Sequence, residues 1–478
     1  MLGALGMQFA SKYTNVLIQL VITMVLARLL SPEQHGIVAI VTVFLALFQI
    51  LADMGIGTAI IQYKDMSHEE LNALFLFSLA LGIVLSLLFC LAAYPISLLY
   101  KEAELVPLCQ VSSLAIFFNT LNMVPNGVLL RDRKFKTISI RVVAVGAASG
   151  VISIAFALAG FGCYALVAQS VLQALLVFAW NWRSSRLSLI QNRHFIKPLK
   201  HIARYSGYQA GFSLMNYFSR NLDNLLVGAT FGATELGNYD KSYKLMQYPI
   251  SNLTGVFSSV LQPYLSLYHS DPGKIYKYWL DICKVLALLG VFFTCCFVLF
   301  PDEIVFVAYG DQWSQVVPVV MLLGLSVAVQ IVNSTSGAIF QSTGRTDYLF
   351  QSGALCTAVS LIAIIFGILS SSIETLALFI SISYFVHFLF TAYFLAWKVF
   401  RVTPSSFLAE FFPYVVIAFT SVGITSAGVE LFDFLPFVAL LPFRILLFLG
   451  SFLAASIAMG QRNVLKAIER MKTIGVES

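Results

Sequence analysis

The residues of this chain that could do chemistry are a few ionisable side chains inside long apolar segments. Lys12 lies in the first such segment and Asp53 in the second. Arg220 and Asp223 are three residues apart in a later segment, so on a helix they share a face and can pair. Charged groups are costly inside a membrane, and they usually face a water-filled cavity or one another. These positions are therefore candidates for a functional site.

A second group of charges follows in the first turns of the next expected helix. Asp240 and Lys244 are four residues apart and share a face, and Lys241 is next to Asp240 in the sequence. With Arg220, the two lysines would create a positive potential, and an arginine can hold a phosphate through two hydrogen bonds. The pattern predicts a binding site for a dense anion such as a lipid pyrophosphate.

These assignments have structural alternatives. Arg220 and Asp223 could form an internal ion pair that only fixes helix packing. Lys241 could extend to the outer membrane interface, as we expect Arg28 to do from the end of the first span. His387 and Arg444 in late helices are expected to be structural groups with their hydrogen bonds satisfied.

Polar uncharged side chains also gather near the charges, and they could bind sugar hydroxyls or hydrogen-bond neighbouring helices. The candidate substrate-binding residues are Arg220, Lys244, Lys241, Lys12, Asn216 and Asn15. The candidate carboxylates for ion coupling, or for a structural pair, are Asp223, Asp53 and Asp240.

The composition explains why each of these few charged residues is informative. Of 478 residues, 59% are hydrophobic and 11% are charged, whereas a soluble domain carries roughly a quarter charged residues. No basic block suited to nucleic acid occurs. The seven cysteines include no CxxC pair, and we expect small buried side chains rather than a metal or redox site. The chain is therefore predicted to be an all-α polytopic membrane protein without a cofactor.

A helix needs about 20 apolar residues to cross the hydrocarbon core, and about fourteen stretches qualify. Their approximate bounds are Leu5–Leu30, Ile37–Ile61, Leu71–Leu99, Leu105–Leu130, Ile138–Ala159, Tyr164–Trp182, Tyr205–Phe231, Leu236–Leu267, Trp279–Phe300, Val316–Gln341, Tyr348–Leu369, Thr375–Val399, Phe407–Val429 and Phe434–Met459. The longest loop on the odd-numbered side runs from about Pro301 to Gln315, with a turn near Gly310.

The loop charges indicate the orientation. Basic residues collect in the even-numbered loops and the tail, whereas the odd-numbered loops hold only Arg28 and Lys101 among many acids. Lysine and arginine near span ends resist translocation. Both termini are therefore predicted to lie in the cytoplasm.

The chain repeats itself at an offset of 201 residues, which sets Gly36 over Gly237 and Asn15 over Asn216. Six helices separate the paired elements, so the two halves share one orientation, as parallel repeats do; such transporters bind substrate at the repeat interface. The alternative is chance similarity among apolar helices. We expect two six-helix lobes at residues 1–183 and 205–400, and a C-terminal helix pair with a basic tail at 401–478.

The basic segment 184–204 joins the lobes. Its interleaved apolar residues are typical of an amphipathic helix on the anionic cytoplasmic leaflet, although an ordinary cytoplasmic loop would carry the same charges. Membrane lipids are thus expected partners.

No P-loop, HExxH or GxSxG motif occurs, so neither an ATP-driven pump nor a common hydrolase is encoded here.

Several short motifs resemble a known family. They are Ala27-Arg28-Leu29-Leu30-Ser31-Pro32 with Gly36, Asp53-Met54-Gly55, Arg220-Asn221-Leu222-Asp223-Asn224, and Leu236-Gly237-Asn238-Tyr239 leading to Pro249. Their order and spacing are similar to those of polysaccharide and O-antigen flippases in the multidrug/oligosaccharidyl-lipid/polysaccharide exporter superfamily. The likeness extends over nearly the whole chain.

The resemblance implies a central cavity and the flipping of undecaprenyl-pyrophosphate-linked oligosaccharide across the bacterial inner membrane, for lipopolysaccharide or exopolysaccharide synthesis. It also suggests an association with polymerases or glycosyltransferases. Lys244 matches a cavity arginine of the lipid II flippases, but their further arginines in the first helix are missing here, which argues against lipid II. The alternatives are an ion-coupled drug or cation antiporter, and a membrane glycan polymerase or ligase.

Overall fold

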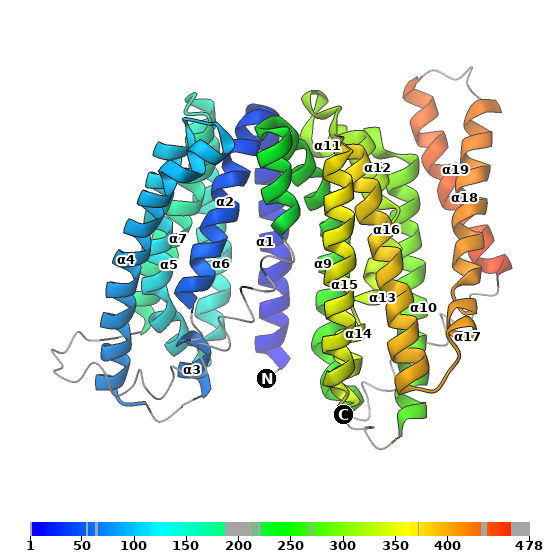
Figure 1. The fold of residues 1–478 in the computed structure, drawn as a ribbon, viewed down its shortest axis with the longest axis horizontal. Coiled ribbons are helices and arrows are strands. Elements are labelled where there is room, and N and C mark those ends of the chain that lie inside the picture. Colours follow the sequence, from blue (N-terminus) through cyan, green and yellow to red (C-terminus); the bar gives the residue numbers. More distant parts are fainter. Residues whose placement is uncertain are drawn as a thin grey trace. The chain divides into compact units, whose positions relative to one another are not determined.

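The structure, a computed structural model, describes residues 2–53, 56–62, 66–185, 187, 214, 217, 221–266, 268, 271–370, 372–431 and 437–459. These residues form helices and turns, and no strand occurs among them (Figure 1). Eleven helices are long and apolar enough to cross a membrane, or twelve if one bent pair counts as a single span. The chain is thus an all-α polytopic membrane protein.

The expected total of fourteen membrane spans stays a prediction. The expected span Tyr205–Phe231 lies mostly outside the described residues. The next helix, α9 (Ala233–Ser266), is 34 residues long, which corresponds to about 50 Å. It is not among the eleven helices that qualify by length and hydropathy.

The helices form two compact units. The first comprises Met1–Asp240 together with Phe306–Trp313, and the second comprises Lys241–Val305 with Ser314–Ser478. The expected lobe boundaries near residues 183 and 205 stay predictions. Helix α9 and helix α11 (Pro301–Tyr309) each contribute to both units.

In the first unit, α5 packs against α2, α4 and α7, while α1 packs on α6. The approach of α1 to α6 relies on small residues, because a side chain at Gly150 would collide with Ile22. The helices are α1 (Leu2–Leu29), α2 (Pro32–Asp53), α3 (Ile56–Gln62), α4 (His68–Tyr100), α5 (Leu105–Arg131), α6 (Phe135–Leu158) and α7 (Cys163–Ser185).

In the second unit, α10 packs against α12, α13 and α18, and α15 pairs with α16. The helices are α10 (Pro272–Leu299), α12 (Val316–Gly324), α13 (Val327–Asn333), α14 (Ser336–Ser342), α15 (Thr346–Leu369), α16 (Ile373–Thr391), the π-helix η2 (Ala392–Val399), α17 (Pro404–Ala409), α18 (Phe412–Leu431) and α19 (Phe437–Ala458). The expected C-terminal helix pair corresponds to α18 and α19.

Two expectations differ from the structure. The expected single span Val316–Gln341 is bent by 47° between Val316–Gly324 and Val327–Ser342. The expected loop from Pro301 to Gln315 is largely helical, as α11 and the short helix η1 (Asp311–Trp313). Pro301 at the first helical position and the acids Asp302 and Glu303 in the first turn explain why α11 begins there.

Local structure supports the internal repeat. At the offset of 201, the amide of His35 donates to Ser31 O and the amide of Leu236 donates to Gly232 O, each at 3.1 Å. Helices α2 and α9 therefore begin at aligned residues, Pro32 and Ala233.

A second pair of turns has the same geometry in the two units. The amide of Lys134 donates to Leu129 O at 2.9 Å, and the amide of Arg345 donates to Phe340 O at 2.8 Å. The residue before each donor has positive φ, 55° at Arg133 and 69° at Gly344. This is the left-handed helix end of a Schellman motif.

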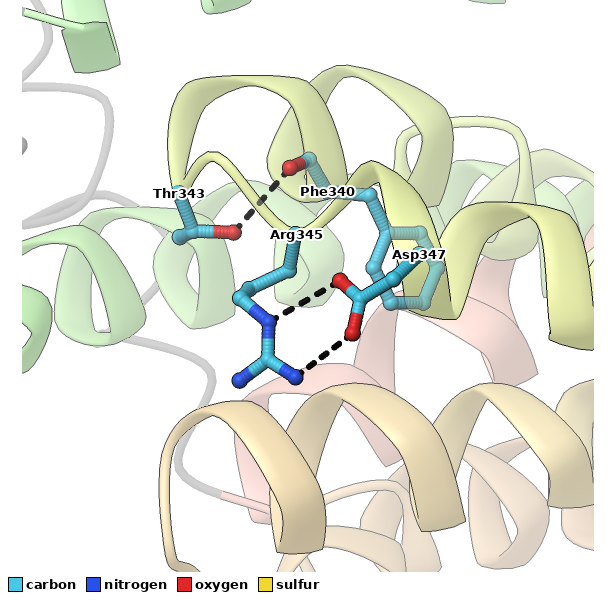
Figure 2. A network of polar contacts seen from close by, with 4 residues as sticks. All are labelled: Phe340, Thr343, Arg345 and Asp347. Carbon is cyan, nitrogen blue, oxygen red and sulfur yellow. Dashed lines mark hydrogen bonds and ion pairs between the residues drawn. The ribbon is translucent and has the colours of Figure 1, made fainter.

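Figure 2 shows the turn in the second unit. The Thr343 hydroxyl donates to Phe340 O at 3.2 Å. Arg345 binds Asp347 through two hydrogen bonds of 3.0 and 2.7 Å, and its guanidinium lies 3.8 Å from the centre of the Tyr348 ring. The hydrogen bond to Asp347, with a second one to Tyr348, raises the pKa of Arg345 above its ordinary value. Arg345 and Asp347 therefore form an ion pair at the start of α15.

Candidate functional site

Three sequence-predicted residues lie on the first two helices. Lys12 is exposed on α1, and Asp53 is the exposed last residue of α2. Asn15 is half-buried, and its side-chain oxygen is buried beside Gly146 of α6, where none of the residues that the structure describes donates a hydrogen bond to it. Asn15 thus presents an unused acceptor in the packed interface between α1 and α6.

Asp223 is 7% exposed and held by hydrogen bonds from two residues. The Tyr239 hydroxyl donates to one carboxylate oxygen at 2.7 Å, and the amide of Asn224 donates to the other at 2.9 Å. This carboxylate therefore has partners on α9 and on its own helix. Its expected partner Arg220, like Asn216, lies outside the described residues.

The two lysines of α9 differ in burial. Lys241 is 4% exposed, whereas Lys244 is exposed and Asp240 is half-buried. The alternative in which Lys241 extends to the membrane interface does not fit this burial. The helix places the buried cation about one turn from the exposed cation.

The first unit holds a buried arginine that was not among the sequence-predicted residues. Arg141 of α6 is 8% exposed. One of its terminal nitrogens donates to the side-chain oxygens of Asn126 at 3.1 Å and Asn181 at 2.6 Å. Asn181 in turn donates to Asn122 at 2.7 Å. Two amides, one from α5 and one from α7, thus bind the guanidinium, and Asn122 of α5 extends the network. The guanidinium has no carboxylate partner in the described part of the chain.

A signal for this cluster was present in the sequence. Arg141 lies inside the expected span Ile138–Ala159, and an ionisable residue inside a span is a candidate functional or structural centre. The three asparagines lie on two other spans, so only the fold could identify them as its partners.

The second unit contains two ion pairs, of which only Arg444 was among the residues that the sequence predicted to be satisfied structural groups. Lys284 of α10 lies 2.6 Å from a carboxylate oxygen of Glu410, which follows α17. Arg444 of α19 donates to Glu303 at 2.7 Å and to Leu299 O at 2.7 Å. Both pairs attach the C-terminal helices to α10 and α11.

His387 fits the structural assignment. One ring nitrogen lies 2.9 Å from Cys356 O and 3.3 Å from the Ser360 hydroxyl. Within the described residues, no three histidine, cysteine or acidic side chains are grouped to hold a metal ion.

A fold of many long apolar helices with a few buried charges defines a class, the multi-pass helical membrane proteins. The solved structure of the lipid II flippase MurJ, in its inward closed conformation, has this fold; its TM-score is 0.74 at 14% identity, and the match covers 95% of this chain and 99% of that one. The profile of the family described as polysaccharide biosynthesis protein matches residues 25–318. The chain belongs to this family, which confirms the resemblance seen in its motifs.

Two proteins of polysaccharide biosynthesis are similar to this chain in sequence. The lipopolysaccharide biosynthesis protein WzxC of Escherichia coli (strain K12) is 25% identical over 355 residues, covering 72% of this chain and 70% of the relative. The teichuronic acid biosynthesis protein TuaB of Bacillus subtilis (strain 168) is 24% identical over 397 residues, covering 80% and 79%.

Proposed function

We propose that this protein moves a lipid-linked oligosaccharide from the cytoplasmic to the outer leaflet of a bacterial inner membrane, for surface polysaccharide synthesis. The observation that carries the proposal is a combination: a family of polysaccharide biosynthesis proteins with the fold of a lipid II flippase over 95% of the chain. The carrier works by alternating access and is not an enzyme. Both termini lie in the cytoplasm, because the basic loops resist translocation.

The substrate's pyrophosphate binds to cations at the start of α9 and on the preceding helix. Lys241 is the buried member and Lys244 the exposed member of this group, with Arg220 and Lys12 as further cations. Asn15 and Asn216 are the candidate hydrogen-bonding groups for the substrate's sugars. A phosphate would bind strongly to such a site, because charge-assisted hydrogen bonds are about twice as strong as neutral ones.

Asp223, Asp240 and Asp53 are the candidate coupling carboxylates. Asp223 is the best supported, because it is buried and already accepts two hydrogen bonds. Membrane lipids and a polysaccharide polymerase or glycosyltransferase complex are the partners of this proposal.

A deletion strain tests the reaction. Single lipid-linked units should accumulate on the inner leaflet of its membrane. Accumulation on the outer leaflet would instead assign the chain to the polymerases or ligases, because the sugar would have crossed without it.

Point variants test the site. Lys244→Ala and Arg220→Ala should each abolish surface polysaccharide at normal protein levels, and Lys244→Arg should restore part of it. Lys136→Ala, which removes an exposed cation at the start of α6, is the control and should leave the polysaccharide unchanged. Full activity of both alanine variants would remove the site assignment.

A further inference from the structure

The amides around the buried arginine of the first unit have a fixed orientation. Arg141, Asn122, Asn126 and Asn181 are called the Arg141 cluster below. A guanidinium can only donate hydrogen bonds, so Asn126 and Asn181 must turn their side-chain oxygens toward Arg141. Asn181 then directs its amide nitrogen to the oxygens of Asn122, at 2.7 Å, and Asn126, at 3.4 Å. The cation thus decides which way all three amides point.

This orientation engages the acceptors of the cluster and leaves donors. The side-chain oxygens of all three asparagines accept hydrogen bonds from within the cluster. The amide nitrogens of Asn122 and Asn126, and the Nη2 of Arg141, find no acceptor among the described residues. The Nε of Arg141 is buried and likewise has none there. A cluster whose remaining groups are N–H donors is complementary to an anion.

The positive charge of the cluster is not balanced by the protein groups around it. Arg141 is 8% exposed and Asn181 is fully buried. In the part of the chain that the structure describes, the guanidinium forms no ion pair. Amide oxygens satisfy its hydrogen bonds but carry no net charge, and a buried ion is costly unless it is also paired. A bound anion would remove that cost.

The equivalent position in the second unit carries no charge. The two Schellman turns end at Lys134 and Arg345, and the same distance beyond them lie Arg141 and Ser352. Ser352 is 7% exposed, so this position is buried in both units. A small neutral side chain is sufficient for helix packing there. Packing alone therefore does not account for the guanidinium.

The Arg141 cluster lies near a set of basic helix ends. Arg141 is within two turns of the start of α6, and Asn181 is within two turns of the end of α7, which is about 10 Å or less along either helix. The basic residues at these ends are Arg131, Arg133, Lys134, Lys136 and Arg183. Their positive potential raises the local concentration of anions beside the cluster.

We propose that the Arg141 cluster binds one monovalent anion of the size of chloride. A single negative charge balances a single guanidinium, whereas a pyrophosphate carries more charge than the cluster can balance. The low exposure of Arg141 favours a small ion over a lipid headgroup. The anion accepts hydrogen bonds from Arg141, Asn122 and Asn126, and it stabilises the packing of α5, α6 and α7. None of these residues belongs to the site proposed for the substrate, so the inference goes beyond the proposed function.

Binding of radioactive chloride tests the site directly. The full-length chain, purified in detergent and exchanged into gluconate, should bind chloride saturably in equilibrium dialysis, with one ion per chain. Arg141→Gln should weaken this binding by about tenfold to a hundredfold, as expected from the loss of a hydrogen bond to a charged group. Arg345→Gln is the matched control, because Arg345 already has a carboxylate partner in Asp347, and it should leave the binding unchanged.

A second variant distinguishes an anion site from a purely structural arginine. Asn126→Asp places a carboxylate of nearly the same size beside the guanidinium, where the Asn126 oxygen now lies 3.1 Å from Nη1 of Arg141. Saturating chloride should raise the melting temperature of the unchanged chain by several degrees, because the ion binds only the folded state. The melting temperature of Asn126→Asp should not respond to chloride, because the carboxylate supplies the missing charge.

Two results would contradict the proposal: an unchanged chain that binds no chloride saturably, or an Arg141→Gln variant that binds it equally well. Native mass spectrometry of both preparations adds a third. A phospholipid retained by the unchanged chain and lost from Arg141→Gln would assign the cluster to a lipid phosphate, and the chloride site would have to be abandoned. Every readout uses purified protein without substrate, so these outcomes are independent of the deletion strain that tests the proposed function.

Discussion

Arg141 donates a 2.6 Å hydrogen bond to the side-chain oxygen of Asn181, and both side chains are buried inside the first unit. The guanidinium bridges α6 to α7, and its hydrogen bond to Asn126 extends the bridge to α5. A charge in this place depends on its amide partners, because an ion without hydrogen bonds is costly to bury.

The first prediction follows from that dependence. Asn181→Leu should lower the free energy of unfolding by about 3 kcal/mol or more, since it leaves a buried cation with fewer partners. Arg141→Met should cost less, because it removes the charge itself and retains most of the volume. Thermal unfolding in detergent measures both. Equal or reversed costs would show that the amides do not compensate the charge.

The second prediction concerns Asp223 and Tyr239. Tyr239→Phe should destabilise the protein by about 1.5 to 3 kcal/mol, the range for hydrogen bonds to charged groups. In an Asp223→Asn background the same substitution should cost much less, because no buried carboxylate loses a donor. Unfolding of the two single variants and the double variant gives the coupling, and a coupling near zero would contradict the arrangement.

The third prediction uses two glycines of the second unit. A Cβ at Gly290 would lie 2.7 Å from the Cα of Ala328, whereas a Cβ at Gly353 has nothing within 4 Å. Gly290→Ala should therefore destabilise the protein by about 1 to 3 kcal/mol through overpacking. Gly353→Ala, in the exposed part of α15, should stabilise it by up to about 1 kcal/mol. The order of the two melting temperatures is the measurement, and a higher value for Gly290→Ala would refute the close packing.

The fourth prediction addresses Lys284 and Glu410. Glu410→Lys should lower the unfolding temperature, because it places two cations next to each other, and the added exchange Lys284→Glu should restore part of the loss. The pair is partly exposed, with side chains 21% and 41% accessible, so we expect a coupling of about 1 kcal/mol or less. Absence of any recovery in the double exchange would mean that the two residues do not pair.

Much of the fold could be predicted from the sequence, because a membrane leaves few choices for the backbone. Only helices and closed β-barrels satisfy the backbone in hydrocarbon, and runs of about 20 apolar residues indicate helices, so these runs predicted most spans. The alignment of Gly36 with Gly237 predicted that α2 and α9 start at equivalent residues. The bend between α12 and α13 was not predicted, since its apolar sequence would equally suit a straight helix.

The candidate site was less predictable. Asp223 could be recognised as a charge inside an apolar run, but its donor Tyr239 is sixteen residues away on another helix. Arg141 and Lys284 carried a similar signal and were missed, because each helix alone does not show which of its faces is buried.

The sequence alone determined that this chain is a polytopic helical membrane protein, and it predicts two like-oriented repeats, because hydrophobicity, loop charge and repeat offset are local properties of the chain. Only the tertiary structure decided which polar groups meet. Arg28 could extend to the interface or cap another helix, and it caps α11 because the fold brings residues 306 and 307 to the end of α1. Partners so far apart in the sequence are selected by packing, which no local pattern encodes.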